Sequence, residues 1–153
     1  MTDTKDTAAQ LNNLIEICKD GEEGFKQAAD NVKCQDLRST LMECSRQRAE
    51  FASALQSQVA RFGQTPEKGG SMLGSMHRGW INLKTAFTTN DDQAVINECE
   101  RGEDSAVAAY VDAMKKELPT DVQSLVSRQY QTVKATHDKI RDIRDSGKLT
   151  AKA

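Results

Sequence analysis

Polar side chains interrupt helix-like apolar patterns in four separate parts of this sequence. They are Glu22, Arg48, Glu103 and His137, and Glu23 directly follows Glu22. Carboxylate oxygens and imidazole nitrogens are ligands of divalent metals. The same groups can neutralise one another around an arginine, because a buried carboxylate is tolerated when a cation faces it. The residue types therefore indicate either a metal site or a buried ion network.

Four long helices are predicted to carry these residues. Apolar residues recur at intervals of three and four over residues 7–32, 37–62, 91–118 and 120–146. Only two prolines are present, which leaves long stretches free to be helical. Helix caps or stops are expected at Thr7, Asp36, Gly63, Asn90 and Thr120.

The connection between the second and third helices is the longest, "GQTPEKGGSMLGSMHRGWINLKTAFTTN". A short extra helix is predicted from about Met72, with Met76, Trp80, Leu83 and Phe87 on its apolar side. A connection of this length can span a bundle and make the flanking helices parallel, as in ferritin-like bundles with one long crossover. An up-down-up-down bundle would need only a short loop there.

The expected fold is therefore an all-α, ferritin-like four-helix bundle with a helical crossover insert. A chain of 153 residues is long enough for a core of its own. We expect one domain over residues 1–153, with frayed tails at 1–6 and 147–153. In this topology a rise of 1.5 Å per residue places the four interrupting side chains about 1.5–6 Å above the midplane, in one layer. In the up-down alternative the four side chains would spread over a wider range of heights, but not by enough to exclude that topology.

The layer of Glu22, Arg48, Glu103 and His137 has two interpretations. A metal site would use Glu22 or Glu23 with Glu103 and His137. Iron is the first candidate metal, and another divalent metal is the alternative. A buried salt-bridge layer around Arg48 would instead fix the register of the helices, and this second interpretation is favoured.

Two glycines flank the first carboxylates in "CKDGEEGF". Gly21 and Gly24 each cost about 1 kcal/mol relative to alanine inside a helix. They are expected either to let a neighbouring helix approach closely or to relax one turn into a π-bulge.

The carboxylates and the histidine resemble the di-metal pattern of ferritin-like proteins, which is one Glu from each of two helices and Glu-x-x-His from the other two. Glu22 or Glu23, Glu103 and His137 match parts of this pattern. The second helix departs from it, because Arg46 stands three residues after Glu43. The fourth helix has Lys134 three residues before His137, and Arg48 directs a permanent cation at the same region.

A closer resemblance covers almost the whole chain. The segments "LNNLIEICKDGEEGFKQAA", "GSMLGSMHRGW", "ECERGEDSAVAAY" and "LVSRQYQTVKATHDKIRDIR" resemble a mostly proteobacterial family of small ferritin-like proteins catalogued as a domain of unknown function. The resemblance implies the fold and no established activity or ligand set. A stress-associated role is an expectation by analogy with the ferritin-like superfamily.

Composition and charge limit the cellular location and the classes of partner that we expect for this protein. The net charge of −2 predicts no nucleic-acid partner, and no apolar run is long enough for a membrane span. No secretory signal is recognised at the N-terminus, so the cytoplasm is expected. The cysteines show no C-x-x-C spacing and are expected to be free thiols, with Cys34 in a turn the best redox candidate.

No complete catalytic constellation is recognisable, so a non-enzymatic protein that acts through a protein partner or by self-association is the leading hypothesis. A homodimer is plausible by the same resemblance. The alternative is an iron-binding protein with oxidase or storage chemistry. His77 is weighed as an extra ligand or proton shuttle against a surface hydrogen-bonding role, and Trp80 is expected to anchor the crossover on the bundle.

Overall fold

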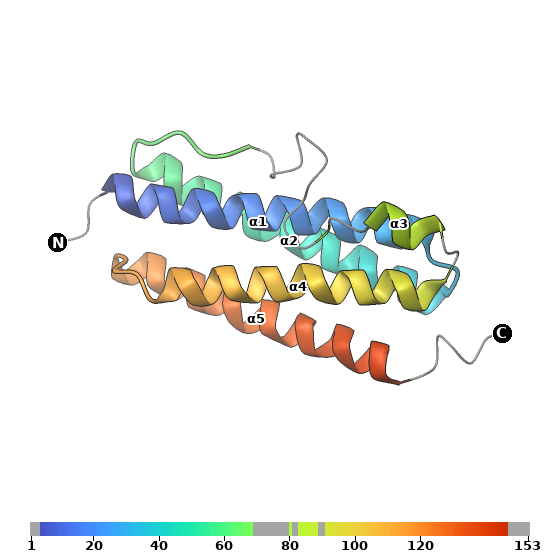
Figure 1. Cartoon of the computed structure of the whole chain (residues 1–153). Coiled ribbons are helices and arrows are strands. Elements are labelled where there is room, and N and C mark those ends of the chain that lie inside the picture. Colours follow the sequence, from blue (N-terminus) through green and yellow to red (C-terminus); the bar gives the residue numbers. More distant parts are fainter. Residues whose placement is uncertain (1–3, 69–79, 81–82, 89–90, 147–153) are drawn as a thin grey trace.

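In the computed structural model, the described residues form four long helices and one short helix (Figure 1). The structure describes residues 4–68, 80, 83–88 and 91–146. The helices are α1 (Thr4–Asn31), α2 (Gln35–Arg61), α3 (Leu83–Thr88), α4 (Asp92–Met114) and α5 (Thr120–Asp145). These described residues contain no strand.

The helix directions are those of a ferritin-like bundle. Figure 1 shows α1 antiparallel to α2 and α4 antiparallel to α5, while α2 and α4 run the same way. The parallel pair requires that the chain between α2 and α4 return along the length of the bundle. The predicted fold, including the long crossover with a short helix, is confirmed.

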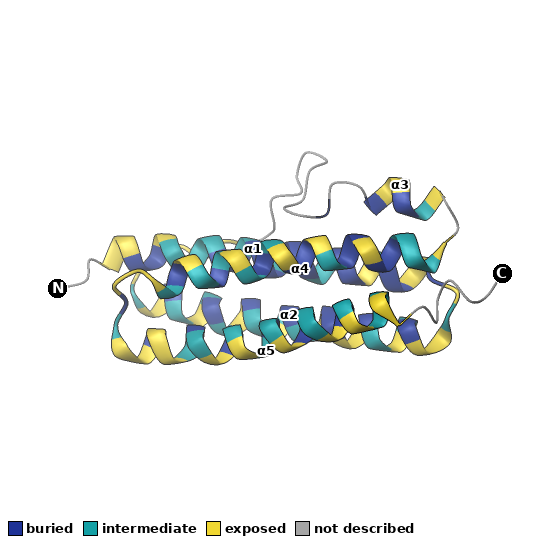
Figure 2. Ribbon diagram, turned by 60° about the horizontal axis from the view of Figure 1, so that its bottom comes forward, coloured by how far each residue is buried: buried dark blue, intermediate teal, exposed yellow. Residues whose placement is uncertain are grey.

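The four long helices do not pack evenly. Extensive contacts join α1 to α2, α4 to α5 and α1 to α4, whereas the backbones of α2 and α5 approach each other at few positions. Side chains join these two helices, with Arg61 bound to Asp121 at 2.7 Å and Thr136 donating to Gln47 at 3.4 Å. Buried residues line the inward faces of the long helices (Figure 2). The α2–α5 side is therefore the loosely closed side of the bundle.

The core consists of two apolar clusters. One contains Leu55 of α2 and Tyr110 of α4, and the other contains Leu41 of α2 and Ile96 of α4. On α2 and α4 the chain passes from one cluster to the other at residues 48 and 103. Polar residues at these two positions therefore lie between two apolar layers.

Helix α1 is buried on more than one face. Leu14 and Ile17 are buried beside the predicted stripe that holds Leu11 and Ile15. The start of the crossover is tied to α1 at a different position, where the side chain of Asn12 donates to the carbonyl of Thr65 at 3.2 Å and accepts from the amide of Glu67 at 2.8 Å.

Several helix ends differ from the predicted ones. Helix α1 begins at Thr4, so residues 4–6 are helical and Thr7 is a buried helical residue instead of the cap. Asp36 lies in the first turn of α2, which starts one residue earlier. Thr120 is the first helical residue of α5 and Pro119 takes the cap position. Gly63 follows α2 with a φ of 74°, as a helix-closing glycine should.

Two neighbouring aspartates organise the start of α4. Asp91, not Asn90, caps the helix by accepting from the amide of Gln93 at 2.9 Å. The Asp92 carboxylate accepts from the amides of Lys33 and Cys34 at 2.9 and 2.8 Å. It therefore ties the α1–α2 turn to α4.

The short crossover helix α3 lies against α4 and α1. Its first residue is Leu83, and Trp80 precedes it outside any helix. The predicted start at Met72, together with Met76 and His77, lies outside the described residues, as do Asn90 and the expected tail at 147–153.

Candidate functional site

Arg48 of α2 and Glu103 of α4 form an ion pair in the centre of the bundle. The two guanidinium nitrogens Nη1 and Nη2 each donate to one carboxylate oxygen, both at 2.6 Å. The side chains are only 1% and 0% exposed, respectively. This bidentate geometry is the strongest form of charge-assisted hydrogen bonding between side chains.

The two opposite charges of the pair compensate each other. Burial alone disfavours the guanidinium charge, but the Coulombic attraction and hydrogen bonds of Glu103 outweigh it and hold the pKa of Arg48 above its ordinary value. The guanidinium carbon also lies 5.5 Å from the ring centroid of Phe25, within range of a cation–π interaction.

Gly21 provides the space for this guanidinium. A Cβ at position 21 would lie 3.3 Å from Nη1 and 3.4 Å from Cγ of Arg48. The glycine lets the arginine lie close against the backbone of α1, so the unusual composition of "CKDGEEGF" is explained in part by the partner helix.

Gly24 and Gly102 form the two walls of a slot that receives the indole of Trp80. A Cβ at Gly24 would lie 2.5–2.7 Å from three indole atoms, and one at Gly102 would lie 2.1–2.6 Å away. Trp80 is 2% exposed and meets Phe25 edge to face at 5.1 Å. We refer to Gly24, Gly102 and the ring seated between them as the indole slot.

The ion pair and the indole slot form one connected unit. Trp80 contacts Phe25, Phe25 lies under Arg48, and Arg48 binds Glu103. The predicted anchoring role of Trp80 agrees with this arrangement. The glycines receive side chains instead of a neighbouring helix, and α1 is α-helical from Thr4 to Asn31 without a π-bulge.

A short chain of buried polar groups lies in the apolar cluster that contains Tyr110. The Cys18 thiol lies 3.2 Å from Tyr110 Oη, which donates to Gln129 Oε1 at 2.6 Å. Burial raises the pKa of Cys18 to about 11 and the pKa of Tyr110 well above its usual value. Both groups are therefore neutral near pH 7, and Cys18 is a poor nucleophile there.

The structure places Glu22 and Glu23 away from the ion pair. The Glu22 carboxylate is 31% exposed and binds Lys19 at 2.9 Å, and Glu23 accepts from Gln27 at 2.9 Å. Only the backbone carbonyl of Glu22 faces α2, where it accepts from Ser45 Oγ at 2.7 Å. Since Glu103 already neutralises Arg48, a second carboxylate in the centre would be a buried, unpaired charge.

His137 also lies outside the predicted layer. Its Nε2 is 2.6 Å from an Asp104 carboxylate oxygen, and its Nδ1 is 3.1 Å from Asp138. Desolvation opposes protonation, but hydrogen bonds to the carboxylates of Asp138 and Asp104 raise the pKa of the imidazole. The histidine thus forms a peripheral clasp between α4 and α5, and the expected layer contains only Arg48 and Glu103.

The candidate ligands do not fit a metal ion in this arrangement. The part of the chain that the structure describes has no group of three His, Cys, Asp or Glu side chains that could hold one. Glu103 offers both oxygens to Arg48, and Glu22, Glu23 and His137 point to other partners. The guanidinium of Arg48 occupies the central position where the ferritin-like pattern would place a metal ion.

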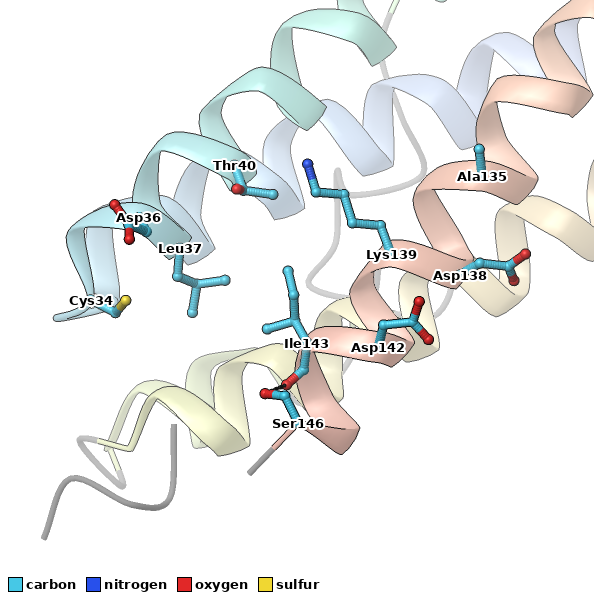
Figure 3. A pocket seen from close by; sticks show the side chains of 10 residues that line it. All are labelled: Cys34, Asp36, Leu37, Thr40, Ala135, Asp138, Lys139, Asp142, Ile143 and Ser146. Atoms are coloured by element: carbon cyan, nitrogen blue, oxygen red, sulfur yellow. Dashed lines mark hydrogen bonds between the residues drawn. The ribbon is translucent and has the colours of Figure 1, made fainter. Parts of the chain in front are cut away.

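A groove of about 720 Å³ opens between α2 and α5 (Figure 3). Leu37 and Thr40 line it from α2, and Ala135, Lys139 and Ile143 line it from α5. The sequence reasoning missed this site because apolar periodicity marks residues that face inward without showing which two helices pack poorly.

The four cysteines are free, as expected. Cys18, Cys44 and Cys99 are buried, and Cys34 is half-buried at one end of the groove. Burial raises the pKa of Cys44 to about 11 and that of Cys99 well above the usual value.

A family model described as "Domain of unknown function (DUF2383)" matches residues 6–116, which is more than half of the chain. The chain belongs to the DUF2383 family. The matched region includes Gly24, Arg48, Trp80, Gly102 and Glu103 and ends before α5. No protein of curated function matches the chain.

A solved structure of a Dps1 mutant from Mycobacterium smegmatis has the same fold. It aligns with a TM-score of 0.74 at 14% identity, over 95% of this chain and 100% of that chain. At this identity the likeness establishes the ferritin-like bundle. Among the described residues, no helix is long and apolar enough to cross a membrane.

Proposed function

We propose that this protein acts by binding another protein or a second copy of itself, without catalysing a reaction. The observation that carries the proposal is the closed centre of the bundle. Arg48 and Glu103 neutralise each other there through a bidentate pair of hydrogen bonds, and Trp80 fills the adjoining slot. A centre filled in this way supports a stable bundle whose work is done on its surface.

The nucleophilic groups support the same proposal. Cys18, Cys44 and Cys99 are buried with raised pKa values, which disfavours the reactive thiolate. The absence of disulfides among four cysteines is what a reducing cytoplasm would produce, and supports the cytoplasm as the site of action.

Iron binding with oxidase or storage chemistry is the alternative, and the ferritin-like fold favours it. It requires Glu103 to leave Arg48 and join Glu22 or Glu23 and His137. Removing a carboxylate from a buried pair strands the arginine, which costs about 3–5 kcal/mol. Metal binding would have to repay that cost.

Anaerobic ferrous titration and elemental analysis of the untagged protein separate the two functions. The binding-protein proposal predicts less than about 0.1 equivalent of retained iron or zinc, and a melting temperature that a chelator does not change. Near-stoichiometric metal, with melting lowered by chelator, would support the alternative and overturn the proposal.

The binding function itself needs a positive test. Sedimentation velocity of the full chain over a range of concentrations reports self-association. Photo-crosslinking in cells of the source organism, followed by repeated binding with the purified candidate, reports a protein partner. A monomer at all concentrations that yields no reproducible partner would contradict the proposal.

A further inference from the structure

Two of the buried thiols lie at matching heights on α2 and α4. These helices run parallel, and the Arg48–Glu103 pair sets their register at a separation of 55 positions (Figure 1). Cys44 and Cys99 have the same separation, and each lies four residues before its neighbour in the ion pair, which is roughly 6 Å along the helix axis. The two cysteines are therefore at one height inside the bundle.

Both thiols point into the same apolar cluster. Cys44 is 7% exposed and Cys99 is 0% exposed, and Leu41 and Ile96, the next matching pair along α2 and α4, belong to the same cluster. Burial raises the pKa of Cys99 most, and Cys44 raises it more than Glu103 does, although Glu103 is on the same helix as Cys99. This order indicates that the two sulfur atoms lie close together.

The two thiols cannot form a disulfide unless the helices move. No Cα atom of α2 lies within 8 Å of a Cα atom of α4. The two Cα atoms of a disulfide are usually about 4.4–6.8 Å apart. Two sulfur atoms that face each other from helices at this separation can instead share a metal ion placed between them.

The donor set favours a soft metal ion that needs few ligands. Thiolates favour Cu(I), and Cu(I) forms stable complexes with only two sulfur ligands. Protein zinc sites take at least three ligands from side chains. The described residues contain no group of three His, Cys, Asp or Glu side chains that could hold a metal. The pair of thiols therefore suits Cu(I) better than zinc or iron.

The charges near the two thiols are compatible with a bound cation. Burial and Glu103 raise the pKa of Cys44, while Arg48 and Lys139 lower it, and the result is about 11. Both thiols are thus neutral at pH 7, and binding releases two protons to solvent. The copper ion and two thiolates then carry one positive and two negative charges, and Arg48 and Lys139 offset part of the excess.

We propose that Cys44 and Cys99 form a two-coordinate Cu(I) site between α2 and α4. The ion bridges the two sulfur atoms, no electron is transferred, and the Arg48–Glu103 pair stays intact. The site goes beyond the proposed binding function and does not depend on it, so either can fail while the other stands.

Anaerobic titration with Cu(I) in competition with bathocuproine disulfonate measures the affinity and the stoichiometry. The full chain is used in a Cys34→Ser background, because Cys34 is the half-buried thiol that copper can reach without entering the core. We expect one Cu(I) per chain. X-ray absorption at the copper edge should then show two sulfur ligands and no nitrogen or oxygen ligand.

Matched cysteine variants locate the ion. Cys44→Ser or Cys99→Ser should weaken Cu(I) binding by more than about 100-fold, which is the upper end for loss of an outer-shell partner. Cys18→Ser is the control, because it makes the same change at a buried thiol of the other cluster, and it should leave the affinity unchanged. Circular dichroism and the fluorescence of Trp80, which packs in the cluster of Cys44 and Cys99, verify the fold.

Each outcome decides the inference. Binding of one equivalent with two sulfur ligands, lost in both Cys44→Ser and Cys99→Ser, supports it. Full binding in either of these variants would assign the copper to an adventitious site and overturn it. An equal loss in Cys18→Ser, a third ligand in the absorption spectrum, or no binding against the competitor would also overturn it. Cys44→Ala and Cys99→Ala repeat the test without a buried hydroxyl if a serine variant unfolds.

Discussion

Arg48 and Glu103 lie 55 positions apart in the chain and share two hydrogen bonds of 2.6 Å, with both side chains essentially excluded from solvent. They connect α2 to α4, two parallel helices that the long crossover separates. A buried pair of this kind adds little net stability over an apolar pair but strongly penalises the loss of one partner.

Removing one partner of this pair should therefore cost much more than removing both. We expect Arg48→Met to lower the free energy of unfolding by about 3–5 kcal/mol, because it strands the Glu103 carboxylate. The double variant Arg48→Met/Glu103→Leu should have a free energy of unfolding close to that of the wild type or higher. Urea unfolding of Arg48→Met, Glu103→Leu and the double variant gives the coupling energy between the two residues.

The pH dependence of Arg48→Met provides an independent check. A stranded buried carboxylate is relieved by protonation, so its folded pKa is raised and the variant should regain stability as the pH falls. If the single and double variants were equally stable and showed the same pH profile, Arg48 and Glu103 would not be energetically coupled.

The glycines of α1 and α4 should respond very differently to alanine. Gly24→Ala and Gly102→Ala place a Cβ inside the indole of Trp80, and overpacking of about 1–3 kcal/mol should outweigh the helix-propensity gain of about 1 kcal/mol. Gly21→Ala brings a Cβ to 3.3 Å from Nη1 of Arg48, a contact that a shift of a few tenths of an ångström relieves, so the helix-propensity gain should leave it near neutral.

Thermal unfolding of the three alanine variants tests this order. Trp80→Leu should suppress the effect of Gly102→Ala, because the smaller side chain leaves room for the new methyl group. Equal destabilisation by Gly21→Ala and Gly24→Ala would show that contact with the indole does not determine the loss of unfolding free energy.

The vertical positions of the polar residues could be predicted, but the directions of their side chains could not. The helical rise predicted one height for Arg48 and Glu103, and these two side chains are paired in the structure. His137 was predicted in the same layer, but its side chain contacts Asp104 at the periphery. Each residue turns a helix by about 100°, so a side chain at the edge of a stripe can point inward or to the surface. The long Glu22 side chain reached Lys19 and water instead of the centre.

The fold followed from the sequence because apolar periodicity and loop length together determine helix number and direction. The indole slot did not follow, since no pattern within α1 reveals a side chain that arrives from residue 80. Gly102, beside Glu103 in "RGED", was the available signal: a glycine inside a predicted helix that has no capping role.

Only one of the four thiols should react quickly in the folded protein. Cys34 is half-buried at the groove, whereas Cys18, Cys44 and Cys99 are buried. Titration with a disulfide reagent at neutral pH should show one fast equivalent that Cys34→Ser removes, followed by three that appear only on unfolding. A fast phase retained in Cys34→Ser would place the accessible thiol elsewhere.

The clasp formed by His137 should stabilise the fold more in acid than in base. Hydrogen bonds to Asp138 and Asp104 outweigh desolvation and raise the folded pKa of His137 above 6.5. The stabilisation is therefore complete below the unfolded pKa and is lost as the pH rises through the folded one. The difference in unfolding free energy between the wild type and His137→Gln should be larger at about pH 5.5 than at about pH 8.5. His77→Gln controls for the other histidine, and a difference independent of pH would show that the charged clasp does not contribute.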